Sequence, residues 1–249
     1  LPLLMTSVTN AVQQRISTRR YLQGKPVPRK LVAEILTHAV RAPSGGNTQP
    51  WHVYVVCGDA RKSLCEAARE ALASGQTATA KEEFAVYPTS KSIPPAPPSF
   101  LNRRRSLGYA MYSLMNINKQ DKAARLSAMM ENYNFFGAPV GMIVTVDKAC
   151  DKNGWGHVGC LLQTICLLAE ERGLGTCLQE AWGNLGPVVY DNLQIPDNET
   201  VWCGIALGFP DPLEPVNSLR SSREPLYKTV SFRGFDNNDD AISNTNVLK

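Results

Sequence analysis

The chain has 249 residues, enough for one large α/β domain or two small ones with a buried core. Hydrophobic residues make up 43% and charged residues 19%, proportions that exclude a globally disordered chain. The net charge of +4 is too small to indicate nucleic-acid binding, and no apolar run reaches the ~18 residues needed to span a bilayer.

Seven cysteines are scattered without a C-x-x-C pair, and none of the three histidines stands at ligand spacing from another. This pattern indicates free thiols in a reducing compartment and argues against disulfides and metal catalysis. The start, LPLLMTSVTN, lacks the basic flank of a signal peptide. We therefore expect a cytoplasmic protein that holds no metal and whose domain begins at Met5.

The first third of the chain predicts three helices and one strand. Val8, Val12 and Ile16 recur at helical spacing, so the first helix is expected to continue into the stretch RISTRR. Pro43 stops the second helix, and the β-branched run WHVYVV follows closely. The elements expected here are helices over 8–20 and 28–40, a strand over 52–57 and a helix ending near 75.

The middle segment, residues 87–136, is expected to leave the core. Its first part, YPTSKSIPPAPPSF, holds five prolines, which excludes a regular helix and an internal strand. Helices are expected over 107–117 and 122–136. We interpret the whole segment as a lid over a site or as a segment that wraps around a partner.

The second half alternates strands with helices. Expected are strands over 140–147, 175–180 and 201–208, a mostly apolar helix over 156–173 that Gly173 ends, a short helix opened by Pro187, an edge strand over 226–235, and a loose tail over 236–249. This pattern predicts an α/β or α+β fold whose central sheet is covered on both faces. A Rossmann fold is disfavoured because two helices precede the first strand and no G-x-G-x-x-G motif opens a helix.

Two stretches carry polar groups suited to ligand binding. In RISTRR, the guanidiniums of Arg15 and Arg19 and the hydroxyl of Ser17 can meet one anion, because arginine forms charge-assisted contacts to phosphate. The alternative is a solvated helix end. In PSGGNTQPW (43–51), small residues expose backbone N–H groups beside polar side chains, and the alternative there is a plain turn between helix and strand. No G-x-S-x-G motif is present, and the histidines have no obvious carboxylate partner, so a bound cofactor is expected to carry the chemistry.

Four separated motifs occur in one order along the chain: RISTRRY, APSGGNTQPWHVYVV, GLGTCLQEAW and ALGFPDP with NSLRSSREPL. Their order resembles that of the bacterial nitroreductase family of FMN-dependent oxidoreductases, and the likeness covers about Val8 to Phe235. The middle segment, with RRRSLGYAMYSLMNI and ENYNFFGAPVGM, is most similar to the branch that reduces nitrobenzoates and dinitroaromatic compounds.

The resemblance implies an α+β fold, a nitroreductase-like three-layer sandwich with a mostly antiparallel central sheet, over residues 5–235. It implies an intertwined homodimer with two FMN sites at the subunit interface. Arg15 and Arg223 then match the arginines at the FMN phosphate, with Ser17 beside them, and Arg19 matches the basic residue at N1 and O2 of the flavin. Pro43, Ser44 and Asn47 match the loop that the partner lays along the ring, and Leu178, Gln179 and Glu180 match the strand whose backbone N–H reaches N5.

This chain departs from the family at two positions. Ile16 stands where the family carries Arg or His, so only its backbone can contact the cofactor, and Ser221 stands where a lysine often precedes the last arginine. Tyr109, Tyr112, Phe135 and Phe136 are candidates for the pocket wall, with packing in the core or a dimer as the alternative.

The function that follows is reduction of nitroaromatic compounds with NAD(P)H by a ping-pong cycle, in which flavin N5 does the chemistry and no side chain is catalytic. The alternatives are an FMN-dependent reductive dehalogenase of halophenols, a flavin reductase that releases reduced FMN, and a flavin-binding accessory protein without turnover.

Overall fold

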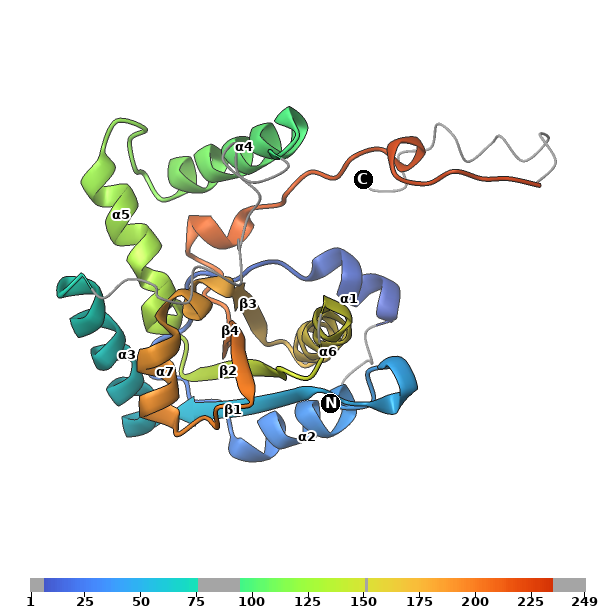
Figure 1. The fold of residues 1–249 in the computed structure, drawn as a ribbon. Coiled ribbons are helices and arrows are strands. Elements are labelled where there is room, and N and C mark those ends of the chain that lie inside the picture. Colours follow the sequence, from blue (N-terminus) through green and yellow to red (C-terminus); the bar gives the residue numbers. More distant parts are fainter. Residues whose placement is uncertain (1–6, 76–94, 151, 235–249) are drawn as a thin grey trace, which may run out of the picture. The chain divides into compact units, whose positions relative to one another are not determined.

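The structure is a computed structural model that describes residues 7–75, 95–150 and 152–234 (Figure 1). The chain forms two compact units, residues 1–219 and 220–249. The first unit thus ends before residue 235, where the sequence placed the end of the domain. Residues 76–94, which include the start of the proline-rich stretch, lie outside the described residues.

The first unit alternates helices with four strands. In chain order its elements are α1 (Val8–Gln14), α2 (Arg29–Ala39), η1 (Gly45–Asn47), β1 (Trp51–Cys57), α3 (Gly58–Ala73), α4 (Pro98–Leu114), α5 (Lys122–Met130), η3 (Glu131–Gly137), β2 (Val140–Asp147), α6 (Lys152–Glu171), β3 (Gly175–Gln179), η4 (Glu180–Leu185), α7 (Gly186–Leu193), β4 (Glu199–Gly208) and η5 (Pro215–Ser218).

The four strands form one sheet in the order β1-β2-β4-β3, and every neighbouring pair is antiparallel. The predicted central antiparallel sheet is therefore confirmed, and the strand expected over 140–147 has those bounds. Because β3 lies at one end of the order, one of its edges has no neighbouring strand of the sheet. This free edge positions the site described below.

Helices cover both faces of the sheet (Figure 1). Met142 and Val144 of β2 and Ile205 of β4 pack with residues of α2 and α6 in one core cluster. Ile143 and Ala206, the neighbours of these residues, pack with residues of α3, α7, η3 and η4 in a second cluster. Successive side chains of a strand point to opposite faces of the sheet, so strands that are apolar along their whole length contribute to a core on each face. The helices on one face, the sheet and the helices on the other face are the three predicted layers.

The first helix is shorter than predicted. It ends at Gln14, and Arg15 already has extended backbone angles, φ −54° and ψ 124°. Beyond it, Ser17 forms a parallel bridge with Thr176 of β3, and the Thr18 N–H donates to the Thr176 carbonyl at 2.9 Å. Pairing with the free edge of β3 thus overrides the helical spacing of apolar residues.

The edge strand predicted over 226–235 is also wrong for the described residues of the second unit. They form a short 3-10 helix, η6 (Leu226–Lys228), and no strand. The apolar side chains that suggested a strand are exposed within their own unit: Leu226, Tyr227, Val230 and Phe232. Alternating apolar side chains do not stabilise a strand when they stay exposed to solvent.

Phe135 and Phe136 belong to the core. Phe135 has no exposed surface, and its ring stacks on Trp182 with centroids 4.7 Å apart. Phe136 is 6% exposed and lies in the same cluster. This corrects the expectation that both rings wall a substrate pocket, because rings buried by the chain's own residues have no face to offer a bound molecule.

No helix of the described residues is long and apolar enough to cross a membrane. All seven cysteines are free, and Cys65, Cys166, Cys177 and Cys203 are buried.

The role of Phe135 in the core is open to a stability measurement. Phe135→Ala should lower the free energy of unfolding by about 3–5 kcal/mol, because it leaves a cavity beside Trp182. Phe100→Ala is the matched control: this ring is 47% exposed on α4, and its loss should cost under ~1 kcal/mol. Denaturant unfolding of both variants provides the comparison, and equal losses would contradict the assignment.

Candidate functional site

The site is built around the extended segment Arg15–Tyr21, which lies along the free edge of β3. Besides the Ser17–Thr176 bridge, Tyr21 pairs with Pro210, and its buried hydroxyl donates to the Thr18 carbonyl at 3.0 Å. Gly175 makes the close approach possible, since a Cβ at this position would come within 2.8 Å of Thr18 Cβ. A glycine at the start of β3 therefore sets how tightly the segment packs against the strand.

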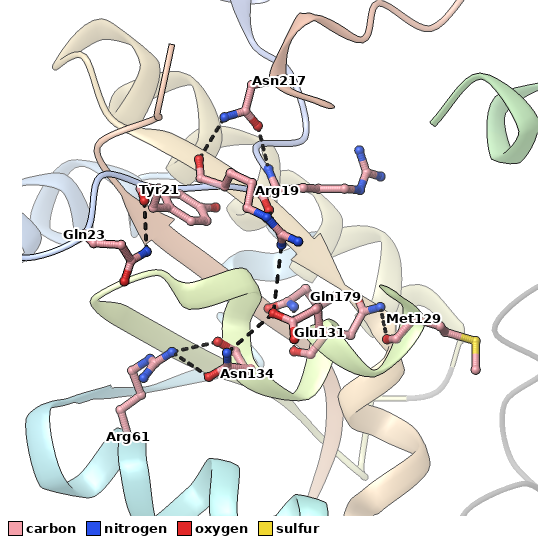
Figure 2. A network of polar contacts seen from close by, with 11 residues as sticks. Arg19, Tyr21, Gln23, Arg61, Met129, Glu131, Asn134, Gln179 and Asn217 are labelled. Carbon is pink, nitrogen blue, oxygen red and sulfur yellow. Dashed lines mark hydrogen bonds and ion pairs between the residues drawn. The ribbon is translucent and has the colours of Figure 1, made fainter. Parts of the chain in front are cut away.

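Asn217 holds the same segment from the other side (Figure 2). Its Oδ1 accepts the backbone N–H of Arg19 at 2.9 Å, while its Nδ2 donates to the carbonyls of Arg20 and Asp211 at 2.8 and 2.9 Å. The side chain is 9% exposed. One buried amide thus satisfies three backbone groups and fixes the position of Arg19.

The predicted phosphate-binding and flavin-binding groups of this segment converge on β3. Burial raises the pKa of the Cys177 thiol to about 11, and the nearby charges of Arg19 and Arg15 and a hydrogen bond with Ser17 act in the opposite direction. All three predicted groups therefore lie within electrostatic or hydrogen-bonding reach of one buried residue of β3. Arg19 also donates from Nη1 to the Ser17 carbonyl at 3.2 Å, so its guanidinium lies back along the segment. Ile16, the neighbour of Arg15, is half-buried.

The end of β3 offers backbone groups at the sheet edge. The Thr176 carbonyl points outward, because it accepts from Thr18. Backbone direction alternates along a strand, so Leu178 presents its backbone groups on the same side, and Glu180 begins η4 directly after the strand. Leu178 is 40% exposed, whereas Gln179 is buried and donates from Nε2 to the Asn132 carbonyl at 2.7 Å. The three residues matched to the flavin strand thus continue the edge on which Arg15, Ser17 and Arg19 lie.

Several polar atoms at this edge are buried without a hydrogen-bond partner. They are Thr18 Oγ1, Gln179 Oε1 and Glu180 Oε2. Thr18 has no exposed surface and Gln179 is 1% exposed, so the chain itself encloses these two side chains, whereas Glu180 is half-buried. The basic groups suit a phosphate, and the edge amides suit a polar ring, so the residues present fit FMN.

The loop 43–49 lies elsewhere on the first unit. Its Gly45 N–H donates to His157 Nε2 of α6 at 3.2 Å, and Ser44 Oγ accepts from the Gln49 N–H at 3.0 Å. Pro43 and Asn47 are exposed, and Asn47 has a left-handed φ of 56°. In the described residues the polar contacts of Pro43, Ser44 and Asn47 stay within the loop or reach α6. Pro43 and Asn47 thus stay exposed on the first unit, and their match to the flavin-covering loop stays a prediction.

Arg223 belongs to the second unit, which is described by itself. Its Nη1 donates to the Ser221 carbonyl at 3.0 Å, to Ser221 Oγ at 2.7 Å and to the Ser222 carbonyl at 3.1 Å. Ser221, which stands where the family carries lysine, is thus a local partner of the arginine. Its match to the phosphate site stays a prediction.

A cavity of about 500 Å³ adjoins the Arg15–Tyr21 segment. It is lined by the end of α4 and the turn after it (114–117), by α5 with Glu131 (124–131), by η5 (214–216) and by Arg20. The volume falls in the range of small-molecule sites. Two of its walls come from the middle segment, which the sequence predicted to cover a pocket.

The remaining aromatic candidates lie on α4. Tyr109 is 38% exposed, and Lys119 Nζ stands 4.5 Å from its ring centroid, whereas Tyr112 is half-buried. Neither lines the cavity. Their contact with a substrate stays a prediction.

Sequence reasoning missed three features. Gly175 and Asn217 lie inside the motifs GLGTCLQEAW and NSLRSSREPL, but their roles were not predicted, because they depend on contacts with residues distant in the chain. The expectation that no histidine has a carboxylate partner was wrong for His52, because its Nδ1 lies 3.9 Å from Glu199 Oε1. Glu199 also accepts from the hydroxyls of Tyr54 and Thr145, which makes this a structural cluster at the sheet edge formed by β1. Adjacent antiparallel strands bring these residues together, and their spacing in the sequence contains no signal for it.

Glu180 yields a prediction on pH dependence. Burial raises the pKa of its carboxyl above the ordinary 4.5, so folding disfavours the charged form. The cost is absent at low pH and grows as pH rises through the raised pKa. Glu180→Gln should therefore be more stable than the parent at about pH 8, with a gain that shrinks toward about pH 4.5. Thermal unfolding at both pH values measures this, with Glu70→Gln at an exposed position of α3 as control; a gain independent of pH would contradict it.

Known proteins resemble this chain over most of its length. Residues 12–209 match the nitroreductase family. A 4-nitrobenzoate reductase of Pseudomonas putida is 34% identical over 95% of this chain and all of its own length. A chloronitrobenzene nitroreductase of Comamonas testosteroni is 36% identical over 86% of this chain and 92% of its own length, and a nitrobenzene nitroreductase of Ectopseudomonas oleovorans is 34% identical over 90% and 96%.

Solved structures agree as well. An FMN and NADPH-dependent nitroreductase, NfnB from Sphigopyxis sp. strain HMH, superposes with a TM-score of 0.86 at 32% identity, over 92% of this chain and all of that one. The FMN-dependent nitroreductase NfnB from Mycobacterium smegmatis, solved with NADPH, gives a TM-score of 0.82 at 26% identity, over 90% and 97%. Fold, site motifs and both comparisons lead to one conclusion: this chain belongs to the nitroreductase family.

Proposed function

We propose that this chain is an FMN-dependent enzyme that reduces nitroaromatic compounds with NAD(P)H by a ping-pong cycle. The observation that carries the proposal is the pairing of the Arg15–Tyr21 segment with the free edge of β3, where Ser17 bridges Thr176 and Arg15 and Arg19 lie close by. The relatives support the chemistry, because they are nitroarene reductases and the similar solved structures are FMN- and NADPH-dependent.

Different residues of the site bind different parts of the cofactor. Arg15 and Ser17, with Arg223, bind the phosphate through charge-assisted hydrogen bonds, while Ile16 contributes only its backbone. Arg19 lies at the pyrimidine edge, and the edge backbone of Leu178, Gln179 and Glu180 supports the ring. When bound, FMN supplies the two-electron transfer from the reduced nicotinamide to the nitro group.

A homodimer completes the site in this proposal. Pro43, Ser44 and Asn47 lie on an exposed loop whose polar contacts stay within the loop or reach α6, so they are available to the flavin of a second copy. One site receives the nicotinamide and then the nitroarene, as a ping-pong order requires, with Tyr109 and Tyr112 of α4 as candidates for contact with the substrate. The free thiols are consistent with a reducing, cytoplasmic location.

The purified protein should be a yellow dimer with about one FMN per chain. In stopped-flow absorbance, NAD(P)H should bleach the flavin colour, and a nitroarene such as nitrobenzene should restore it quickly. Both steps follow because one site serves both substrates in turn. Restoration by a halophenol but not by a nitroarene would favour the dehalogenase, and free reduced FMN would favour a flavin reductase. A colourless monomer that ignores added FMN would overturn the proposal.

The roles of the arginines can be separated by redox titration. Arg19→Ala should lower the flavin midpoint potential, because a cation at the pyrimidine edge stabilises the reduced, negatively charged ring more than the oxidised one. A loss of ~1.4 kcal/mol of this differential stabilisation corresponds to ~30 mV. The backbone anchor to Asn217 survives this substitution, since it uses the N–H of residue 19.

Arg15→Ala and Arg223→Ala are the matched comparison for that titration. The phosphate keeps its charge in both redox states, so these variants should weaken FMN binding with little change in potential. Dissociation constants and potentials are measured at one salt concentration. A potential that moves in Arg15→Ala and stays fixed in Arg19→Ala would reverse the assignment.

A further inference from the structure

The extended segment beside β3 changes its partner midway along its length. Ser17 forms a parallel bridge with Thr176 of β3, whereas Tyr21 forms an antiparallel bridge with Pro210, just after the end of β4. Arg19 lies halfway between the two bridges. The backbone thus passes from one partner to the other at the residue whose side chain is proposed to face the flavin.

Asn217 supplies the hydrogen bonds at this crossing point (Figure 2). Its Oδ1 accepts the Arg19 N–H at 2.9 Å, and its Nδ2 donates to the carbonyl of Arg20 at 2.8 Å and to that of Asp211 at 2.9 Å. One side chain therefore ties the Arg19–Arg20 peptide to the chain that leaves β4. Because Asn217 is only 9% exposed, water has little access to replace these hydrogen bonds.

The short helix η5 that carries Asn217 is itself held in place. Pro215 begins the helix and restricts its backbone, and the Asn217 N–H donates to the Glu214 carbonyl at 3.0 Å. Val216, the residue before Asn217, is buried with 2% of its surface exposed. The amide of Asn217 is therefore presented to the segment from a defined position.

The guanidinium of Arg19 depends on the same stretch of backbone. Its Nη1 donates to the Ser17 carbonyl at 3.2 Å, so the contact that orients it lies within the segment. Burial raises the pKa of the Cys177 thiol on β3, and Arg19 is the strongest of the nearby charges that lower it. The charge of Arg19 thus acts on the edge of β3, and a shift of the backbone would change this action, because the interaction of charges falls with distance.

We infer that Asn217 is a positioning residue for the redox reaction: it holds the backbone of Arg19 so that the guanidinium stabilises reduced FMN. The inference rests on the proposed function, in which Arg19 lies at the pyrimidine edge of the flavin. Asn217 acts only through Arg19 in this role. Its loss should therefore weaken the binding of the reduced, negatively charged ring more than that of the oxidised ring.

The test is a redox titration of the FMN-loaded protein, combined with the FMN dissociation constant. Asn217→Ala should weaken the binding of reduced FMN about threefold more than that of oxidised FMN, which lowers the midpoint potential by ~15 mV for a two-electron couple. The shift should be smaller than in Arg19→Ala, because the guanidinium is displaced and not removed. Asn217→Ser, whose shorter side chain cannot make all three hydrogen bonds, replaces Asn217→Ala if that variant does not fold.

A double variant separates positioning from a general structural role. In the Arg19→Ala background, Asn217→Ala should cause no further shift of the potential, because no guanidinium remains to be displaced. Leu64→Ala is the control for lost stability: this side chain is fully buried on α3, and its truncation should lower the free energy of unfolding without moving the potential. Additive shifts in the double variant, or the same shift in Leu64→Ala, would overturn the inference.

The outcomes also distinguish the inference from the proposed function. If Arg19→Ala lowers the potential and Asn217→Ala lowers only the free energy of unfolding, Asn217 has a structural role and the inference alone fails. If neither substitution moves the potential, the proposed role of Arg19 fails as well. A parent protein that binds no FMN would overturn both the inference and the proposed function.

Discussion

The site depends on one backbone constraint, the pairing of residues 17–21 with the free edge of β3. Gly175 lets Thr18 approach the strand, and Asn217 fixes the backbone on either side of the Arg19–Arg20 peptide. Without these contacts the segment would be a solvated helix end, and its arginines would point into water. Backbone atoms make these contacts, so the side chains of the segment remain available for a ligand. Because the fold already orders the segment, binding a ligand costs less conformational entropy.

Burial has a second consequence at the same edge. Thr18 Oγ1, Gln179 Oε1 and Glu180 Oε2 are enclosed without partners, and enclosure also raises the pKa of Glu180. Such groups reduce the stability of the protein by itself, so an apolar replacement would serve a purely structural role better. The edge strand, with its open backbone groups and two nearby guanidiniums, is the part of the fold that we propose to hold the cofactor.

The sequence predicted the sheet well, because its strands are buried on both faces and appear as short, nearly continuous apolar runs. The strand over 140–147 has its predicted bounds for that reason. Prediction failed in two places: the segment after Gln14 left its helical pattern to pair with Thr176, and the alternating apolar side chains near Phe232 are exposed and form no strand. Family resemblance predicts Arg15, Ser17 and Arg19 as site residues, whereas the role of Asn217 appears only in the structure, since two of its three backbone partners, Arg19 and Arg20, stand about 200 residues earlier in the chain.

The short element η3 links the core to the site and explains why Phe135 is not a wall of the pocket. Phe135 and Phe136 both have left-handed φ values, 49° and 51°, which bulky residues adopt only when packing over-determines them. The turn they form directs both rings into the core and leaves the start of η3 facing the site, where Glu131 meets Arg20 and the Asn132 carbonyl meets Gln179. Core packing against Trp182 therefore sets the position of the carboxylate beside Arg20. A substitution deep in the core can for this reason move Glu131 at the cavity without replacing any residue that lines it.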